Sequence, residues 1–475
     1  MTPLDLATRH ARIQNALERC GQSHLLTYWA ELTADQRLEL LDDLERINFA
    51  EVPNLARQAR GEAAESHAGG SLEPATVLAR ETASRTAVET GRRLLAEGKV
   101  AALTVAGGQG TRLGFAGPKG AFPISPIKDK TLFQLFAESI LAAGRRSGRP
   151  VPWYIMTSPS NDAATRDFFE AHRHFGLAAG QIRFFEQGVM PAFGRDGRIL
   201  LDEKHRVALS PDGHGGSLLA MATRGVLADM AARGVEVISY FQVDNPLVHC
   251  IDPLFLGLHV ETQAEMSGKT LPKADDLERV GNFVMQDGKL TIVEYSDFPE
   301  SLARARNPDG SRRFDAANIA IHALSRTFVE RLTADPSRFA LPWHRAEKKV
   351  PFVDPATGRR VEPEKPNAVK LESFVFDALP LARRTMLLAT SRGEEFSPVK
   401  NAEGVDSVAT ARRDLSRRAA HWLESAGLRI PRGTDGDPTG LYEISPLAAL
   451  EAAHAREIVN KVTPAAIGSG RCYVE

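Results

Sequence analysis

A glycine-rich segment with two nearby cations is the part of this sequence best suited to chemistry on phosphates. It runs Val105-Ala-Gly-Gly-Gln-Gly-Thr-Arg-Leu-Gly114 and is followed by Pro118-Lys-Gly120. Glycine permits sharp turns and a close approach of the backbone to a ligand, so several N–H groups can face one anion. Arg112 and Lys119 place fixed positive charge beside those N–H groups. The segment therefore predicts a cradle for a triphosphate.

Two commoner phosphate-binding loops do not match this segment. A P-loop needs Gly-x-x-x-x-Gly-Lys-Ser/Thr, and no Lys-Ser/Thr pair follows these glycines. The dinucleotide fingerprint needs Gly-x-Gly-x-x-Gly, which from Gly108 and Gly110 requires a third glycine where the chain has Leu113. The pattern therefore argues against a P-loop enzyme and against a nicotinamide-dependent dehydrogenase.

The glycine-rich segment follows a short apolar run, and three similar apolar runs come later in the sequence. The four candidate strands are Val100–Ala106, Trp153–Thr157, Ile182–Phe185 and Val235–Val243. Helical patterns lie between them, at about 131–146, 161–174 and 216–233. Such alternation indicates right-handed crossovers, a mostly parallel sheet, and ligand binding at the carboxyl ends of the strands. Asp244 follows the fourth run and is expected at such an end, although an Asx turn would also explain it.

The flanking regions follow other patterns. Residues 1–97 are expected to be helical, with a capping-box pattern at Thr33–Gln36 ahead of apolar residues that share one helix face. Residues 282–294 predict a hairpin, and residues 377–475 mix short strands and helices. We therefore expect an α/β fold with a Rossmann-like core and a mixed, mostly parallel sheet over 98–376. A helical N-terminal region (1–97) and a small α/β C-terminal region (377–475) would complete it.

Composition excludes several classes of protein. Lys plus Arg number 59 and Asp plus Glu 60, so the basic excess expected of a nucleic-acid-binding protein is missing. No apolar run is long enough for a transmembrane helix, and the N-terminus lacks the apolar stretch of a signal peptide. The three cysteines form no Cys-x-x-Cys pattern, as in a reducing compartment. We expect a cytoplasmic protein without nucleic-acid or membrane partners; no pattern indicates an oligomeric state.

The glycine-rich segment also resembles the signature of the UDP-sugar pyrophosphorylases, Gly-Gly-x-Gly-Thr-Arg-Leu-Gly followed by Pro-Lys-Gly. These enzymes join a sugar 1-phosphate to the uridylyl group of UTP and release pyrophosphate. The likeness extends in order over about 100–405 and is greatest to the UDP-N-acetylglucosamine branch. The other matching segments are Phe184–Gly188, Pro211–Gly216, Val243–Asn245, Val293–Ser296, Ala317–Ala320, Glu347–Asp354, Lys365–Asn367, Phe374–Asp377 and Phe396–Asn401.

The resemblance implies a nucleotidyltransferase with UTP and a sugar 1-phosphate as substrates and Mg²⁺ as cofactor. Its catalytic domain would be 98–376, with 377–475 contributing Lys400. The groups implied to offset phosphate charge in catalysis are Arg112, Lys119 and Lys400. The residues implied to bind the nucleotide are Val105, Ala106, Gly107, Gly108, Lys119, Gln187, Gly213, Asp244 and Lys400, with Asp244 also the metal ligand. The residues implied to bind the sugar phosphate are His214, Gly281, Glu294, Tyr295 and Asn318.

One position departs from that branch. His214 stands where the N-acetylglucosamine enzymes usually carry asparagine, whereas the UDP-glucose enzymes have Gly-His-Gly there. N-acetylglucosamine 1-phosphate is the expected sugar, glucose 1-phosphate is the alternative within the class, and a non-catalytic nucleotide-sugar sensor is the alternative outside it. Several of these residues also have a purely structural interpretation. Gln187 could cap a turn, Glu294 could be the exposed end of a strand, and Phe374 and Phe376 could belong to the core.

Overall fold

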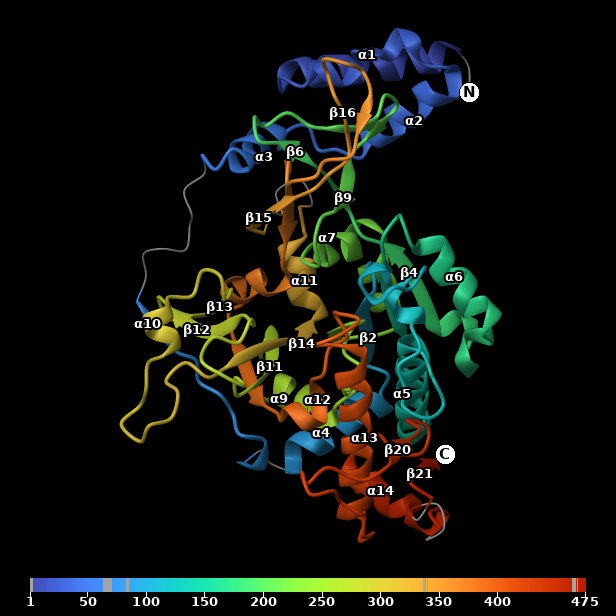
Figure 1. The fold of residues 1–475 in the computed structure, drawn as a ribbon, viewed down its shortest axis with the longest axis vertical. Coiled ribbons are helices and arrows are strands. Elements are labelled where there is room, and N and C mark those ends of the chain that lie inside the picture. The colour runs from blue at the N-terminus through green and yellow to red at the C-terminus, as the bar shows by residue number, and fades with distance from the viewer. Residues whose placement is uncertain are drawn as a thin grey trace. The chain divides into compact units, whose positions relative to one another are not determined.

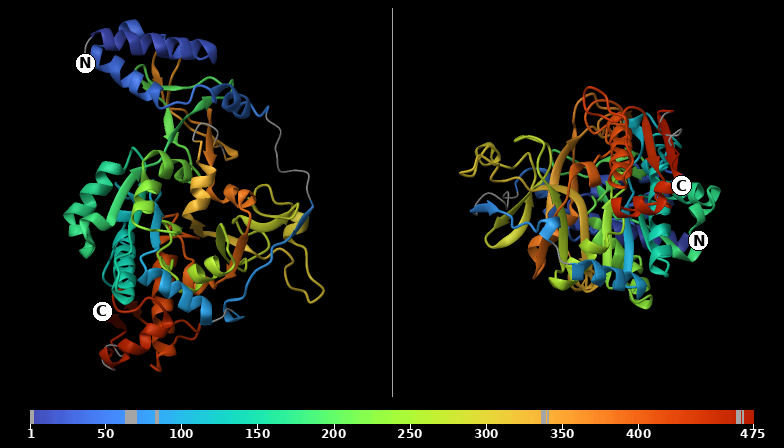
Figure 2. Two further views of the ribbon diagram at one scale, coloured as in Figure 1. Left: turned by 180° about the vertical axis from the view of Figure 1, so that it is seen from behind. Right: turned by 90° about the horizontal axis from the view of Figure 1, so that it is seen from below.

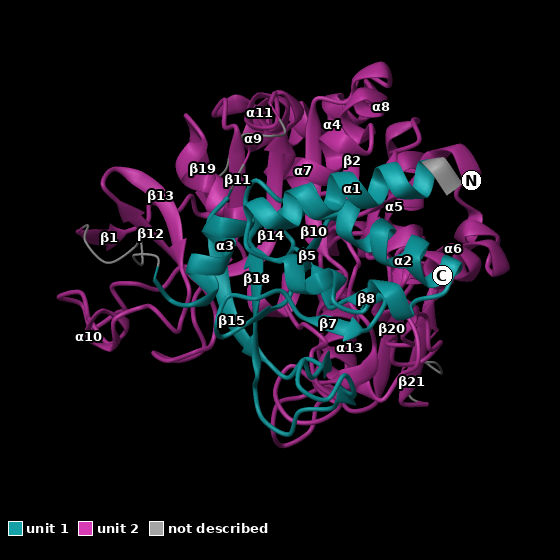
Figure 3. Ribbon diagram, turned by 90° about the horizontal axis from the view of Figure 1, so that it is seen from above, with its two compact units in different colours: residues 1–70, 187–217, 340–375 teal, residues 71–186, 218–339, 376–475 magenta. Residues whose placement is uncertain are grey.

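The computed structural model describes residues 3–62, 71–82, 85–335, 339, 341–463, 467 and 469–475. The chain forms two compact units, each built from several segments (Figure 3). Unit 1 comprises residues 1–70, 187–217 and 340–375, and unit 2 comprises 71–186, 218–339 and 376–475. The division at 375/376 lies next to the boundary expected at 376/377, and the chain also passes from one unit to the other at 70/71, 186/187, 217/218 and 339/340.

A ten-stranded mixed sheet forms the centre of unit 2 (Figure 1). In spatial order its main path is β1 (Leu72–Pro74), β12 (Asn282–Gln286), β14 (Ala317–Ser325), β10 (Val237–Gln242), β2 (Val100–Val105), β3 (Trp153–Thr157) and β4 (Ile182–Glu186). The strands off this path are β13 (Lys289–Val293), which pairs with β12, β11 (Met266–Leu271), which pairs with β14, and β19 (Thr385–Ala389), which pairs with β11.

The pairing directions divide this sheet. Strands β10, β2, β3 and β4 are parallel neighbours, as the alternation of strands and helices predicts. Beyond β10, strand β14 runs antiparallel to both β10 and β11, and β12 and β13 form the predicted hairpin. The α/β class and the mixed sheet are therefore confirmed, and the antiparallel strands lie on the β14 side of β10.

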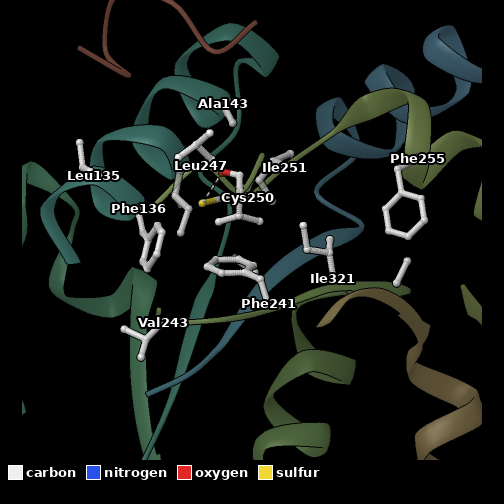
Figure 4. Packing of buried hydrophobic residues seen from close by; sticks show 14 of the residues in the cluster. Leu135, Phe136, Ala143, Phe241, Val243, Leu247, Cys250, Ile251, Phe255 and Ile321 are labelled. Atoms are coloured by element: carbon white, nitrogen blue, oxygen red, sulfur yellow. Dashed lines mark hydrogen bonds between the residues drawn. The ribbon is translucent and has the colours of Figure 1, made fainter. Parts of the chain in front are cut away.

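Helices from several parts of the chain complete unit 2. They are α4 (Arg85–Ala96), α5 (Leu132–Ser147), α6 (Asp162–Ala171), α8 (Val226–Ala232), α9 (Pro253–Glu261), α10 (Glu300–Ala303), α11 (Arg326–Leu332), α12 (Arg392–Glu395), α13 (Val408–Ser425) and α14 (Ala452–Ile458). α7 (Gly216–Thr223) precedes α8, and Gly225, with φ of 68°, separates them where the sequence suggested one helix. Phe136 of α5 packs edge-on against Phe241 of β10 beside Cys250, within the main core (Figure 4).

The C-terminal segment belongs to unit 2 and lies at the end of α5 (Figures 1 and 2). Its strands β20 (Leu441–Ile444) and β21 (Arg471–Val474) pair in parallel. The Glu443 carboxylate accepts hydrogen bonds from the backbone N–H groups of Ile127 and Lys128, at 2.7 and 2.9 Å. Buried Lys130 donates to both Glu138 and Ser445. These buried polar contacts attach residues 377–475 to the central domain.

Unit 1 has its own core. Its helices are α1 (Pro3–Arg19), α2 (Ala34–Glu45) and α3 (Val52–Ala59), and Thr33 with Gln36 forms the predicted capping box of α2. Its paired strands are β5 (Val189–Pro191) with β9 (Leu209–Pro211), β7 (Leu201–Glu203) with β8 (Arg206–Val207), β16 (Phe352–Val353) with β17 (Arg360–Val361), and β18 (Ala368–Ser373) between β15 (Trp343–Lys348) and β6 (Phe193–Gly194). Leu40 and Leu44 share one apolar cluster with Phe193 and Leu371, so the N-terminal helices pack on strands distant in sequence.

None of the described helices combines the length and the apolar character needed to cross a lipid bilayer.

Candidate functional site

The glycine-rich segment lies directly after β2, between the ends of two parallel neighbours. Val105 pairs with Gln242 of β10 and with Met156 of β3. Gly108 is exposed, and its carbonyl accepts a hydrogen bond from the Lys119 N–H at 3.1 Å. A second bond joins Gly110 N–H to the Gly117 carbonyl at 2.9 Å. The loop is therefore closed on itself, with Lys119 beside the exposed glycine.

The Asn161 side chain fixes this loop by hydrogen bonds, a role that the sequence pattern did not reveal. Its buried amide donates to the carbonyls of Ala106 and Gly108, at 2.9 and 3.3 Å. The Ser158 hydroxyl donates to the Gly107 carbonyl at 2.9 Å. These bonds occupy loop carbonyls, and loop N–H groups then remain the better-placed partners for an anion. The only local clue was that Asn161 follows the end of a strand adjacent to β2.

Asp244 and Lys400 belong to two chain segments that a backbone hydrogen bond joins. Asp244 is half-buried immediately beyond β10, and its carbonyl accepts a hydrogen bond from Val399 N–H at 2.8 Å. Within the described parts of the chain, its carboxylate forms no hydrogen bond or ion pair. The Asx turn that competed as an explanation belongs to Asn245, whose side-chain oxygen accepts from Leu247 N–H at 3.3 Å. Lys400 Nζ lies 3.2 Å from Asp406 Oδ2.

Three of the residues expected to bind sugar lie together in unit 2. The N–H of Asn318 donates to the Gly281 carbonyl at 2.8 Å. A Cβ atom on Gly281 would come within 3.1 Å of Glu294 Oε1 and 3.7 Å of Asn318 Cβ. A larger residue at 281 would therefore fill the space that these groups share. Tyr295 is 48% exposed, which is also compatible with the end of a surface strand.

Gly213 and His214 occupy a turn in unit 1 that requires glycine at position 213. Gly213 has φ of 87°, and a Cβ there would overlap the Ser373 carbonyl, so only glycine suits this position. His214 Nδ1 accepts a hydrogen bond from Val375 N–H at 3.1 Å. Its neutral ring therefore carries its proton on Nε2. The Phe374 ring stacks between His214 and His344, with centroids 5.1 and 4.2 Å away.

Phe374 and Phe376, which could both have been core residues, differ in their surroundings. Phe374 is half-buried and braces the His214 ring, whereas Phe376 is buried. An acceptor at position 214 satisfies the Val375 N–H, and an asparagine oxygen can serve the same purpose. The histidine is therefore compatible with this turn.

Asp212 is a second residue that motif reasoning passed over. Its side chain is only 8% exposed, and Oδ1 accepts a hydrogen bond from Gln187 Nε2 at 3.4 Å. Cβ atoms on Gly188 or Gly216 would overlap the carboxylate, so these glycines make room for it. Burial raises the pKa of Asp212 to about 6, and the hydrogen bonds from its own N–H and from Gln187 only partly oppose this.

In a separate cluster of possible metal ligands, a buried lysine already offsets the negative charge. Among the described residues, His249, Asp252 and Glu395 come close enough to share an ion. Lys269, which is fully buried, donates to Asp252 Oδ2 at 2.7 Å and also to Glu395. Although burial opposes it, the cations Lys269 and Arg80 hold the pKa of Asp252 below its usual value. The ammonium of Lys269 thus already pairs with the two carboxylates of this cluster.

Comparison with known proteins decides the family. The model of the UTP–glucose-1-phosphate uridylyltransferase family matches residues 55–420. The human UDP-N-acetylhexosamine pyrophosphorylase-like protein 1 is 39% identical over 469 residues, covering 92% of both chains. The chain belongs to this uridylyltransferase family. The UDP-N-acetylglucosamine pyrophosphorylase of Saccharomyces cerevisiae is 33% identical over 437 residues, covering 87% of this chain and 91% of the yeast protein.

A solved structure supports the same conclusion for the fold of this uridylyltransferase. The uridine diphosphate N-acetylglucosamine pyrophosphorylase of Trypanosoma brucei superposes with a TM-score of 0.82, at 26% identity and with 98% of each chain covered. The prediction of a nucleotidyltransferase is confirmed. The site residues predicted from the sequence lie between 105 and 400, inside the range that the family model matches.

The buried Asp212 carboxyl leads to a prediction about stability. In the native state it keeps its proton up to about pH 6, whereas in the unfolded chain it releases the proton near 3.8. Stability is therefore lost as pH rises through this window, by about 3 kcal/mol in total. Because asparagine does not titrate, we expect Asp212→Asn to unfold at a higher temperature than the wild type at pH 8. The difference should shrink towards pH 4; equal midpoints at pH 8 would contradict an uncompensated buried charge.

Proposed function

We propose that this uridylyltransferase forms UDP-N-acetylglucosamine and pyrophosphate from UTP and N-acetylglucosamine 1-phosphate. The observation that carries the choice of sugar is the grouping of Gly281, Glu294 and Asn318, the residues that the resemblance assigns to it. A carboxylate and an amide offer the acceptors and donors that sugar hydroxyls and an acetamido group require. Several relatives that match most of this chain also carry that activity in their names.

We propose nucleotide contacts for the residues that the resemblance assigns to this role. The backbone from Val105 to Gly108 follows the base and ribose, and Lys119 binds the phosphates. The Gln187 amide and the Gly213 backbone match the donor–acceptor edge of uracil. The exposure of Gly108 leaves its backbone accessible to a ligand, and the positive φ of Gly213 requires glycine there; both features support these assignments.

In the proposed reaction an oxygen of the sugar 1-phosphate attacks the α-phosphorus of UTP. The bond from that phosphorus to the β-phosphate oxygen breaks, and its electron pair leaves with pyrophosphate. A phosphate dianion is already a nucleophile, so the protein contributes positioning and charge neutralisation and needs no activated side chain. Arg112 and Lys119 offset charge on the leaving pyrophosphate, and Lys400 offsets charge near the α-phosphate.

Asp244 has the chemistry of a Mg²⁺ ligand. Its half-buried carboxylate has no protein partner among the described residues and follows a central parallel strand, where ligands of such sheets bind. Mg²⁺ is commonly held by one or two carboxylates together with substrate phosphates, so one protein carboxylate fits such a site. When bound, the ion supplies neutralisation of phosphate charge. Asp244 would orient it, and the bond from Val399 N–H to the Asp244 carbonyl keeps the Lys400 segment nearby.

We also propose that the enzyme works in the cytoplasm. The support is that Cys20, Cys250 and Cys472 are all free thiols, as expected in a reducing compartment.

The choice of sugar is tested by following pyrophosphate release from UTP and Mg²⁺ with three sugar 1-phosphates in turn. We expect N-acetylglucosamine 1-phosphate to give the highest kcat/KM, ahead of N-acetylgalactosamine 1-phosphate and glucose 1-phosphate. A preference for glucose 1-phosphate would show that His214 outweighs the Gly281 group. No release with any of the three, despite UTP binding, would favour the non-catalytic sensor.

The lysines are tested by Lys119→Ala and Lys400→Ala. Each variant should fold normally and lose roughly 10²–10³-fold in kcat, because a positioned donor to developing charge is removed. Lys349→Ala is the matched control, since Lys349 is an exposed lysine of the same chain. Turnover near that of the wild type in both folded variants would remove these lysines from the mechanism.

The metal ligand is tested by Asp244→Asn. An amide is a weaker ligand for a hard cation than a carboxylate, so the variant should need much more Mg²⁺ for half-maximal activity. The measurement is a Mg²⁺ titration of turnover at saturating UTP. An unchanged titration curve would exclude Asp244 as the ligand.

A further inference from the structure

Gln187 and Asp212 lie at one end of the antiparallel pair of strands β5 and β9. The ladder runs from Pro191 paired with Leu209 to Val189 paired with Pro211, and Asp212 N–H then donates to the Gly188 carbonyl at 3.3 Å. Both side chains are almost buried, with 5% of Gln187 and 8% of Asp212 exposed. Their hydrogen bond is therefore shielded from competition by water.

A carboxylate partner dictates which way the Gln187 amide points. An ionised carboxylate only accepts hydrogen bonds, whereas an amide has one donating and one accepting end. The nitrogen end must therefore face Asp212, as observed, and the oxygen end points away from it. Within the described residues this is the one hydrogen bond of the Gln187 side chain, so its oxygen is available to a ligand.

The free oxygen suits one pyrimidine and not the other. Uracil presents an N–H donor at N3, and an amide oxygen can accept from it. Cytosine presents an unprotonated, accepting nitrogen at N3, which meets the same oxygen as a repulsive pair of acceptors. Sites that offer a buried hydrogen-bonding group discriminate strongly against a partner that cannot pair with it.

We propose that Asp212 is a positioning residue that fixes the orientation of the Gln187 amide and so selects uracil over cytosine in the nucleotide. This inference rests on the proposed function, in which Gln187 contacts the base. Asp212 acts through Gln187 and does not touch the base itself.

The surroundings of Asp212 argue against a role in stability alone. The groups that alter its pKa are its own backbone N–H and the Gln187 amide, and none of them is charged. A buried carboxylate without a cation destabilises the folded chain, and a neutral asparagine would fill the same space at lower cost. The space itself is reserved, because Gly188 and Gly216 lack the Cβ atoms that would collide with the carboxylate.

The decisive variant is Asp212→Asn, assayed for kcat/KM with UTP and with CTP at pH 8. Asparagine can present either its oxygen or its nitrogen to Gln187, so the amide is free to turn its nitrogen towards the base. The ratio of kcat/KM for UTP to that for CTP should fall at least about tenfold, the factor that corresponds to 1.4 kcal/mol. Asp35→Asn is the matched control, because it removes one charge from an exposed site in unit 1. An unchanged ratio in a folded Asp212→Asn protein would overturn the proposal.

Gln187→Leu separates this proposal from the proposed function. If kcat/KM for UTP is unaffected by Gln187→Leu, Gln187 does not contact the base, and that part of the proposed function fails. If it falls, the double variant Gln187→Leu/Asp212→Asn should discriminate no less than Gln187→Leu alone, because Asp212 then has no amide to orient. A further loss of discrimination in the double variant would show that Asp212 acts by another route.

A measurement on the wild type covers the case in which Asp212→Asn does not fold. Protonation of Asp212 turns its carboxyl into a donor that can hold the Gln187 oxygen, which directs the amide nitrogen towards the base. The UTP/CTP ratio should therefore fall as pH decreases from 8 to 5.5. Titration of the substrate phosphates affects both nucleotides alike and cancels in the ratio. A ratio independent of pH would contradict the proposal.

Discussion

Parallel hydrogen bonding of β2 to both β10 and β3 determines where phosphate chemistry can take place in this uridylyltransferase. Because the three strands run in the same direction, their carboxyl ends meet at one edge of the sheet. The glycine-rich loop, Asn161 and Asp244 all lie just beyond those ends. Side-chain bonds from Asn161 and Ser158 then tie up loop carbonyls, so that the cradle presents N–H groups. The carboxylate that we propose as a cation ligand and the loop that we propose as a phosphate cradle can share this edge because the sheet aligns them.

Buried charge in unit 2 reinforces the same edge. Lys269 on β11 joins Asp252, which caps α9, to Glu395 at the end of α12. The Glu395 carbonyl accepts from the Asn245 amide, whose oxygen accepts from Ser397 N–H. Breaking such a pair leaves an uncompensated buried charge, which is strongly destabilising. The segments that carry Asp244 and Lys400 are therefore held by contacts that do not themselves participate in the chemistry.

Asp212 in unit 1 contrasts with this arrangement, because no cation among the described residues pairs with its buried carboxylate, whereas buried Asp43 of the same unit pairs with Arg206. The Asp212 carboxylate lies against Gly188 and Gly216, and among the described side chains only the Gln187 amide donates a hydrogen bond to it. Burial raises the pKa of Asp212. Such a buried carboxylate lowers the stability of the folded chain at neutral pH, and it also fixes which end of the Gln187 amide faces it. Proteins commonly hold destabilising groups where recognition needs them. The stacked Phe374 ring similarly fixes His214, whose proton position follows from the Val375 N–H.

The sequence by itself determined the class of chemistry, because glycines, Arg112 and Lys119 at short spacing need no distant partner to indicate a phosphate cradle. Local periodicity likewise located the parallel strands and the hairpin to within a residue or two of their ends. Tertiary structure alone decided what depends on residues far apart in the chain. It brought Gly281 and Glu294 to Asn318, joined residues 187–217 and 340–375 to the N-terminal helices, and buried Asp212 beside Gln187. Burial and strand pairing are properties of packing between distant segments, and short-range patterns do not encode them.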